Sequence, residues 1–315
     1  MQPVVRKLIA GAVSIILGFA LTACASAPIV KVDIALRQIN VVTTVGMITD
    51  IVRNVGGERV AVRGLMGPGV DPHLYKPSAG DAIRLGNADI IFYGGLHLEG
   101  RMAELFEKIE LTGKPAVAVS RDIDPKRLRQ PPEFEGKYDP HIWFDVSLWQ
   151  SATRTVAAAL TSLDPNSAAL YAANASAYLA KLETLDQYAR SQIATIPAAQ
   201  RVMITAHDAF GYFGQAYGME VRGLQGISTA SEISAADVQG LTEFITSRKI
   251  KALFVESSVP ESTVRAVQEA VRSRGHEVLI GGELFSDAMG AEGTPEGTYI
   301  GMVTFNVDTI VSALR

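Results

Sequence analysis

The chain has 315 residues, of which 48% are hydrophobic and 20% are charged, and it contains a single cysteine. This composition excludes a disordered chain and a disulfide-rich scaffold. Twenty-nine basic and thirty-three acidic residues give a net charge of −4. Because no basic stripe breaks this mixture, nucleic acid is not an expected partner. The length exceeds the usual size of a single hydrophobic core and therefore favours two domains.

Residues 1–23 have the pattern of an export signal, with Arg6 and Lys7 ahead of a long apolar run. The run has about 14 residues, which is short of the ~20 that a membrane helix needs. It ends in Leu21-Thr22-Ala23-Cys24, which resembles a bacterial lipobox. We therefore expect lipidation at Cys24 and an extracytoplasmic protein anchored to the membrane. The alternative is ordinary cleavage after Ala27, which would release a soluble exported protein.

After a tether at residues 24–37, the chain alternates β-rich runs with amphipathic helical patterns. Strands separated by helix-length connections imply parallel βαβ units, so residues 38–163 are expected to form one α/β lobe. Its strands are expected at Val41–Val45, Arg59–Leu65, Ile90–Tyr93 and Ala116–Val119, with helices ending near Asn54 and over Glu99–Ile109.

A second series of the same kind occupies residues 198–315. The expected fold class is α/β, with two lobes that each contain a mainly parallel sheet flanked by helices. Strands of the second lobe are expected at Val202–Thr205, Glu220–Gly223, Ala252–Val255 and Val278–Ile280, with helices over Ala235–Arg248 and after Thr298.

Residues 164–197 are expected to form a linker helix between the lobes. Asp164 suits the N-cap and Pro165 the first turn, and no glycine or proline interrupts the run that follows before Pro197. A helix of about 30 residues would reach about 45 Å, enough to join two lobes as a single long rigid helix. Two shorter helices within one domain are the alternative.

Imidazole and carboxylate must supply any metal site, because lipidation would consume Cys24. Two histidines each follow an Asp-Pro pair, which stiffens the loop that presents them. A third histidine and an aspartate follow expected strands, at the sheet edge where ligands bind in parallel α/β folds. Two of these candidates come from each lobe, so together they would close a site between the lobes. The four are His73, His141, His207 and Asp287.

Three further side chains are weaker candidates. Glu256 ends a strand and is expected to orient a ligand imidazole by accepting its second N–H, outside the ligand set. His97 and His276 lack the Asp-Pro setting and are not expected to bind metal, and His276 is expected at the surface. The chain carries no phosphate-binding loop, dinucleotide loop, His-Glu-x-x-His motif or complete nucleophile elbow. An enzyme is therefore not expected.

Five sequence blocks resemble the metal-binding lipoproteins of bacterial ABC importers for zinc and manganese, most closely the TroA type of this cluster A-I family. The resemblance covers nearly the whole mature chain. It implies two α/β lobes joined by one long rigid helix, with ligands matching His73, His141, His207 and Asp287 around a metal between the lobes. The blocks are Val70–Tyr75, Asp139–Phe144, Thr205–Phe213, Phe254–Ser258 and Gly281–Asp287.

The same resemblance implies that a monomeric carrier passes its ion to an ABC permease powered by a cytoplasmic ATPase subunit. Three imidazoles and one carboxylate suit zinc better than manganese. Manganese-devoted members of the family usually carry glutamate at the position of His207, which also favours zinc. Zinc-devoted members often carry a His-rich loop ahead of the second ligand, whereas residues 122–140 contain no histidine. The expected cargo is therefore zinc and/or manganese, with zinc favoured.

Two other classes of protein stay open. In a secreted zinc-dependent hydrolase, three protein ligands would hold the metal, water would take the open position and Glu256 would act as general base. Four protein ligands argue against this alternative. In a surface adhesin the metal would be structural, and its removal would unfold the protein.

Overall fold

The computed structural model describes residues 34–315. The expected signal segment 1–23, the lipidation site Cys24 and the tether up to residue 33 lie outside the described residues. The described chain opens with a 3₁₀ turn at Ile34–Leu36. Within residues 34–315, no helix is both long and apolar enough to cross a bilayer.

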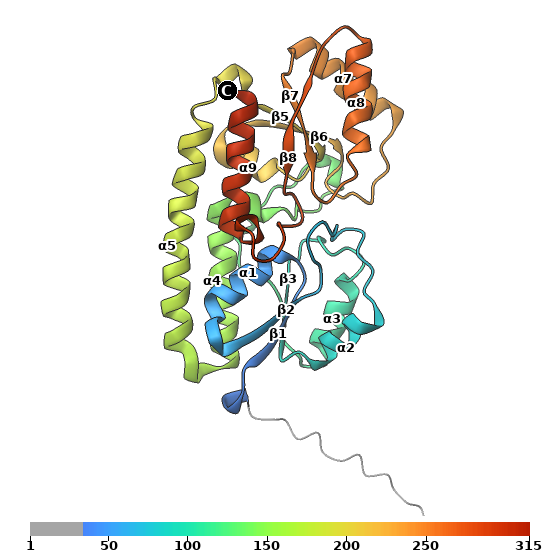
Figure 1. Cartoon of the computed structure of the whole chain (residues 1–315). Coiled ribbons are helices and arrows are strands. Elements are labelled where there is room, and N and C mark those ends of the chain that lie inside the picture. The colour runs from blue at the N-terminus through green and yellow to red at the C-terminus, as the bar shows by residue number, and fades with distance from the viewer. Residues whose placement is uncertain (1–33) are drawn as a thin grey trace, which may run out of the picture. The chain divides into compact units, whose positions relative to one another are not determined.

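A four-stranded parallel sheet forms the N-terminal half, in the order β2-β1-β3-β4. Both central strands are almost wholly buried, as expected where helices cover both faces. Figure 1 shows α1 on one side of this sheet, and α2 and α3 on the other. The strands are β1 (Ile39–Thr43), β2 (Val60–Gly64), β3 (Ile90–Tyr93) and β4 (Ala116–Ala118), and the helices are α1 (Gly46–Gly56), α2 (Ala79–Asn87) and α3 (Ala103–Leu111).

The C-terminal half contains two parallel strand pairs, β5 with β6 and β7 with β8. Strand β5 also lies against β7, and helices α7 and α8 cover these strands on the side away from α9 (Figure 1). The expected α/β class with parallel strands in both halves is confirmed. The strands are β5 (Val202–His207), β6 (Glu220–Gln225), β7 (Ala252–Glu256) and β8 (Leu279–Leu284), and the helices are α6 (Gly211–Tyr217), α7 (Ala235–Arg248), α8 (Ser262–Ser273) and α9 (Tyr299–Leu314).

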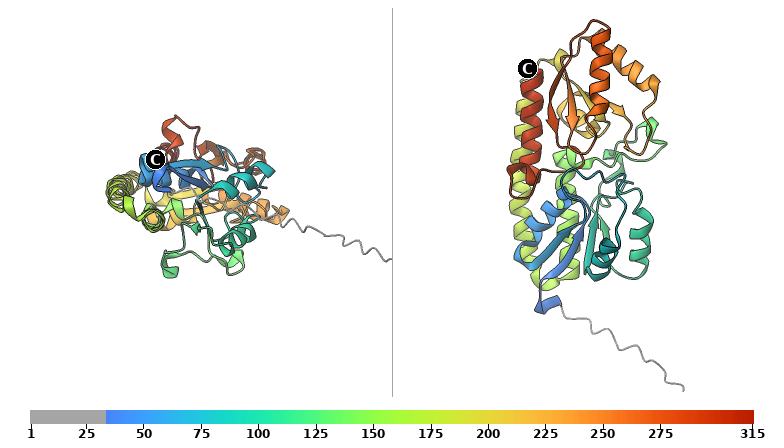
Figure 2. Two further views of the ribbon diagram at one scale, coloured as in Figure 1. Left: turned by 90° about the horizontal axis from the view of Figure 1, so that it is seen from below. Right: turned by 45° about the vertical axis from the view of Figure 1, so that its right-hand side comes forward.

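One uninterrupted helix, α5 (Ala168–Ile193), has 26 residues and spans both halves. It packs against α4 (Val146–Leu163) and α1 on the N-terminal side, and against α6 and α9 on the C-terminal side. Figure 2 shows α5 running beside both strand groups, with α9 next to it along the C-terminal half. The expected long helix is therefore confirmed as a single helix.

The structure differs from the expected elements in three respects. Asp164 and Pro165 do not begin the long helix, because a separate 3₁₀ turn at Pro165–Ser167 precedes α5, which starts at Ala168. Helices α2, α4 and α8 were not expected; α2 begins with a capping box formed by Ser78 and Asp81. Helix α3 begins at Ala103 rather than Glu99; residues 96–102 form turns, in which Leu96 and His97 have positive φ angles of 53° and 68°. The buried Glu99 carboxylate instead accepts hydrogen bonds from the Thr44 hydroxyl at 2.6 Å and from backbone N–H groups of the preceding turn.

Candidate metal centre

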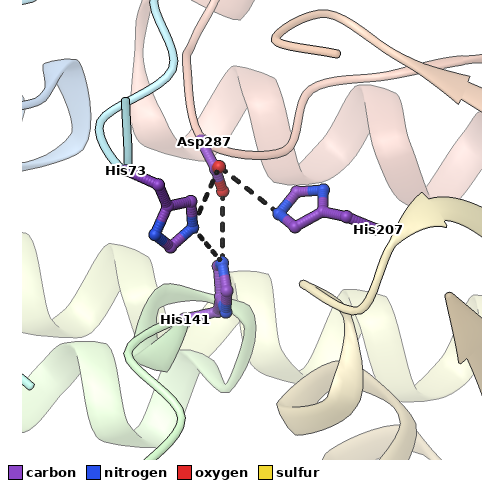
Figure 3. A group of neighbouring side chains, drawn as sticks. All are labelled: His73, His141, His207 and Asp287. Atoms are coloured by element: carbon purple, nitrogen blue, oxygen red, sulfur yellow. Dashed lines mark hydrogen bonds and ion pairs between the residues drawn. The ribbon is translucent and has the colours of Figure 1, made fainter. Parts of the chain in front are cut away.

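The four candidate ligands meet between the two halves of the molecule (Figure 3). His73 lies in the loop after β2, and His141 directly precedes a 3₁₀ turn that leads into α4. His207 is the last residue of β5, and Asp287 follows β8 by three residues. All four side chains are at most 3% exposed. Parallel strands from both halves thus bring their carboxyl ends to one point, as doubly wound folds do at their binding sites.

The candidate ligand atoms surround a common centre. His73 Nε2 lies 3.3 Å from His141 Nε2. The Asp287 carboxylate lies 3.5 Å from His73 Nε2, 3.4 Å from His141 Nε2 and 3.3 Å from His207 Nε2. Ligands about 2.0–2.1 Å from a tetrahedral zinc ion stand about 3.3–3.4 Å apart. These four separations therefore fit a tetrahedral ion, and the whole set lies within 4.8 Å.

Three atoms of this cluster are buried without a hydrogen-bond partner: His207 Nε2 and both carboxylate oxygens of Asp287. A buried polar atom without a partner costs free energy comparable to a lost hydrogen bond, and a buried carboxylate costs more. A divalent cation at the centre would supply the missing interaction to all three atoms at once. The donor set therefore fits a metal ion on its own chemistry.

The ring of His141 is held from behind by an ion pair. Asp139 Oδ1 accepts hydrogen bonds from His141 Nδ1 at 2.8 Å and from its backbone N–H at 3.0 Å. Arg129 Nη1 donates to Asp139 Oδ2 at 2.6 Å. The arginine passes so close to Gly211 that a Cβ there would lie 1.2 Å from Nη1, which explains the glycine. Because Nδ1 of His141 is occupied by this series of contacts, Nε2 is the nitrogen that faces the centre of the cluster.

Glu256 holds His207 in the same way from β7. Its Oε2 lies 2.5 Å from His207 Nδ1, and its Oε1 accepts the His207 backbone N–H at 2.9 Å. Both carboxylate oxygens are therefore engaged, and Glu256 is outside the cluster of four. The ring of His207 again presents Nε2 to the centre.

His73 has the weakest support of the three imidazoles. Asp71 Oδ1 accepts its backbone N–H at 2.8 Å but does not contact the ring. Both Asp-Pro-His segments thus use the aspartate to fix the backbone of the histidine two residues later, and only Asp139 also reaches the imidazole.

The three imidazoles differ in basicity. Burial lowers the pKa of His73 to about 3. Burial also opposes protonation of His141, but its hydrogen bond to Asp139 and the nearby negative charge of Asp287 prevail and raise its pKa to about 9. Although His207 is buried, the charges of Glu256 and Asp287 raise its pKa well above the ordinary value. Burial would raise the pKa of Asp287, yet His207 and His141 hold it well below its usual range.

The two remaining histidines lie outside the cluster. His97 is exposed. His276 is half-buried, and its Nε2 lies 2.9 Å from the Ile250 carbonyl oxygen, so it is less exposed than expected. The sequence reasoning did not single out Arg129, or the separate part that Asp139 plays at the ring of His141. The repeated Asp-Pro-His pattern is the signal that could have identified the aspartate.

Comparison with known proteins gives the same picture. Residues 41–313 match the family model ZnuA, described as zinc-uptake complex component A, periplasmic. The chain is 54% identical to the zinc-binding protein TroA of Treponema pallidum over 87% of this chain and 88% of TroA. It is 47% identical to the manganese-binding lipoprotein MntA of Bacillus subtilis over 94% and 96% of the two chains. The solved structure of Treponema pallidum TroA superimposes with a TM-score of 0.86 at 52% identity, covering 88% and 99% of the chains. The chain therefore belongs to the ZnuA family of metal-binding solute-binding proteins of zinc and manganese ABC importers.

Proposed function

We propose that this chain captures one zinc or manganese ion with His73, His141, His207 and Asp287 and delivers it to an ABC permease driven by an ATPase subunit. The observation that carries the proposal is the fully buried group of three imidazoles and one carboxylate, with unpartnered atoms facing one centre. A buried anionic site of this kind stabilises a bound cation and excludes water from it.

Zinc is the favoured cargo. The donor set and the 3.3–3.5 Å separations suit tetrahedral zinc, whereas manganese favours more oxygen ligands and a higher coordination number. The two relatives named above are described as binding zinc and manganese respectively, so manganese stays within the proposal.

We also propose that the mature protein is a monomer anchored outside the cytoplasm through a lipid on Cys24, and that it is not an enzyme. In a zinc hydrolase, Glu256 would have to accept a proton from a metal-bound water. Here both oxygens of that carboxylate contact His207, so neither is free for such a water. Four protein ligands would also fill a tetrahedral shell.

Elemental analysis tests this function. Residues 25–315 are stripped with a chelator, shown to be folded, and equilibrated with equal zinc and manganese. We expect about one metal per chain with zinc in excess, near-complete loss of metal in His207→Ala, and full retention in the matched control His276→Ala. A folded chain that retains no metal would overturn the proposal.

A further inference from the structure

The loop that carries His73 is joined to the C-terminal half by a single side-chain hydrogen bond within the described residues. This His73 loop comprises residues 65–78, between β2 and α2. Thr229 Oγ1 donates to Asp71 Oδ2 at 2.6 Å, across 158 positions of the chain. The other oxygen of the same carboxylate accepts the backbone N–H of His73 at 2.8 Å. Asp71 therefore links a hydroxyl of one lobe to the backbone of a proposed ligand in the other.

The loop that contains Thr229 is held by Gln225, a residue that neighbours His207 in the candidate metal site. Thr229 lies in a loop at residues 226–234, whose carbonyl groups at positions 229 and 231 both accept hydrogen bonds from the Gln225 side chain. Gln225 ends β6 and is paired in register with His207 on β5. A continuous line of contacts thus runs from His207 through Gln225, Thr229 and Asp71 to His73.

His141 is attached to the C-terminal half much more firmly. The Tyr212 hydroxyl donates to the carbonyl of Asp139 at 3.0 Å. Trp143 Nε1 donates to the Ser286 carbonyl at 3.0 Å, and the Tyr299 hydroxyl donates to the carbonyl of Trp143 at 2.6 Å. His141 is therefore held by the C-terminal lobe, which also supplies His207 and Asp287, although its own segment of the chain leads into α4 beside the N-terminal sheet.

Solvent reaches the contact between Asp71 and Thr229. A surface cavity of about 450 Å³ is lined by both residues and by Leu74, Gln225 and Thr263, among others. The partly buried hydrogen bond between Thr229 and Asp71 lies at the wall of this cavity, whereas Trp143 and Tyr299, which hold the His141 segment, are fully buried.

Resting on the function proposed above, we propose that Thr229 is a positioning residue that holds His73 on the metal through Asp71. Three ligands, His141, His207 and Asp287, form a unit attached to the C-terminal lobe. His73 is the detachable fourth, and the metal leaves when the hydrogen bond between Thr229 and Asp71 breaks and the His73 loop moves away. Thr229 thus sets the rate of release without touching the ion.

The test is the rate at which zinc-loaded full-length mature protein, residues 25–315, gives up zinc to an excess of a chromogenic chelator in stopped flow. Thr229→Val keeps the shape of the side chain and removes the hydroxyl. We expect release about tenfold faster, the change that corresponds to about 1.4 kcal/mol. Thr229→Ser restores the hydroxyl and should restore the wild-type rate. Thr263→Val is the matched control, because Thr263 lines the same cavity but its hydroxyl donates within its own turn, to the Pro260 carbonyl.

A second arm separates the specific contact from a general loss of structure. In a chain that already carries Asp71→Ala, Thr229→Val should leave the release rate unchanged, because the contact is already absent. If the Thr229→Val variant released zinc at the wild-type rate, this inference would be wrong and the proposed function would be unaffected. An equal acceleration by Thr229→Val with and without Asp71 would also overturn this inference. If the wild-type chain bound no zinc, the proposed function would fail and this inference with it.

Discussion

Each imidazole of the cluster has one nitrogen facing the centre, and the three differ in what supports the rest of the residue. Asp139 contacts the ring of His141, and Glu256 contacts the ring of His207. The aspartate beside His73 contacts only its backbone. Partners of this kind fix the tautomer and increase the basicity of the ligand. The residues behind the ligands therefore decide how strongly protons compete with the metal.

Zinc binding is expected to release protons at neutral pH. The carboxylates of Asp139, Glu256 and Asp287 raise the pKa of His141 to about 9 and that of His207 well above its ordinary value, so protons compete with the metal for both rings. A metal must displace these protons. We expect about one to two protons released per zinc, and an affinity that falls as the pH falls. Titration calorimetry in two buffers of different ionisation enthalpy measures the number, and identical heats in both buffers would contradict the prediction.

Glu256→Gln is expected to weaken zinc binding about 10- to 100-fold, the usual effect of losing a carboxylate behind a metal-bound histidine. The amide preserves the size of the side chain and removes the charge that supports His207. Competition with a chelator of known affinity measures the change. Glu283→Gln on the neighbouring strand β8 is the control, since Glu283 is exposed and its variant should bind as the wild type does. Equal affinity in both variants would show that Glu256 does not support the ligand.

At the scale of elements, α5 is fastened to each half by tyrosine–aspartate hydrogen bonds. The Tyr178 hydroxyl donates to Asp50 Oδ2 of α1 at 2.6 Å. The Tyr217 hydroxyl of α6 donates to Asp186 Oδ1 of α5 at 3.0 Å. Asp50 is half-buried, and burial raises the pKa of its carboxyl. The helix is thus fixed to each half by a contact that needs specific side chains.

Tyr178→Phe is expected to lower the free energy of unfolding by about 1–3 kcal/mol, because it leaves a largely buried carboxylate without its donor. Tyr188→Phe makes the same change on the same helix, where the partner Asp308 lies in an exposed contact. Its effect should stay within about 0.5 kcal/mol. Urea denaturation of the metal-free proteins measures both values. If both variants lost a similar free energy of unfolding, the contact between Tyr178 and Asp50 would contribute no more to stability than the exposed contact between Tyr188 and Asp308.

For the whole molecule, α5 runs beside both strand groups and packs against α9 in the C-terminal half (Figure 2). A hinge that opened widely would have to break the packing of α5 against α1 or against α9 and α6. Such packing resists large rotation. Metal release is therefore expected to use local motion or a modest tilt of one lobe.

Small-angle scattering should give nearly the same radius of gyration for the metal-free and the zinc-loaded protein. The physical reason is the continuous helix that both lobes share. An increase corresponding to an opening of tens of degrees on metal removal would contradict a rigid connection.

Metal removal is expected to leave the chain folded. The apolar core contains none of the four cluster residues, and Asp139 and Glu256 hold the rings of His141 and His207 by hydrogen bonds that need no metal. Far-UV circular dichroism after chelation should match that of the loaded protein. Zinc should raise Tm, because it binds only the folded state. Unfolding on chelation would favour a structural metal instead.

The sequence by itself determined the α/β class, the long helix and the four residues that meet at the centre. The reason is that each depends on a local signal: apolar runs of strand length, a helix without glycine or proline, and histidines after Asp-Pro or after strands. Boundaries were less certain where a tertiary contact intervened. Helix α3 begins late because Glu99 is drawn to Thr44, 55 positions earlier in the chain.

Only the tertiary structure decided what lies behind the candidate ligands and which of them we propose to be detachable. Arg129 meets Asp139 through a loop that folds back, and Thr229 meets Asp71 from 158 positions away. Neither Arg129 nor Thr229 carries a local pattern, because a polar side chain in a loop finds its partner only when two separate elements pack. Local sequence patterns therefore predict the candidate ligands. The basicity of the imidazoles and the proposed route of metal release depend instead on contacts between distant segments.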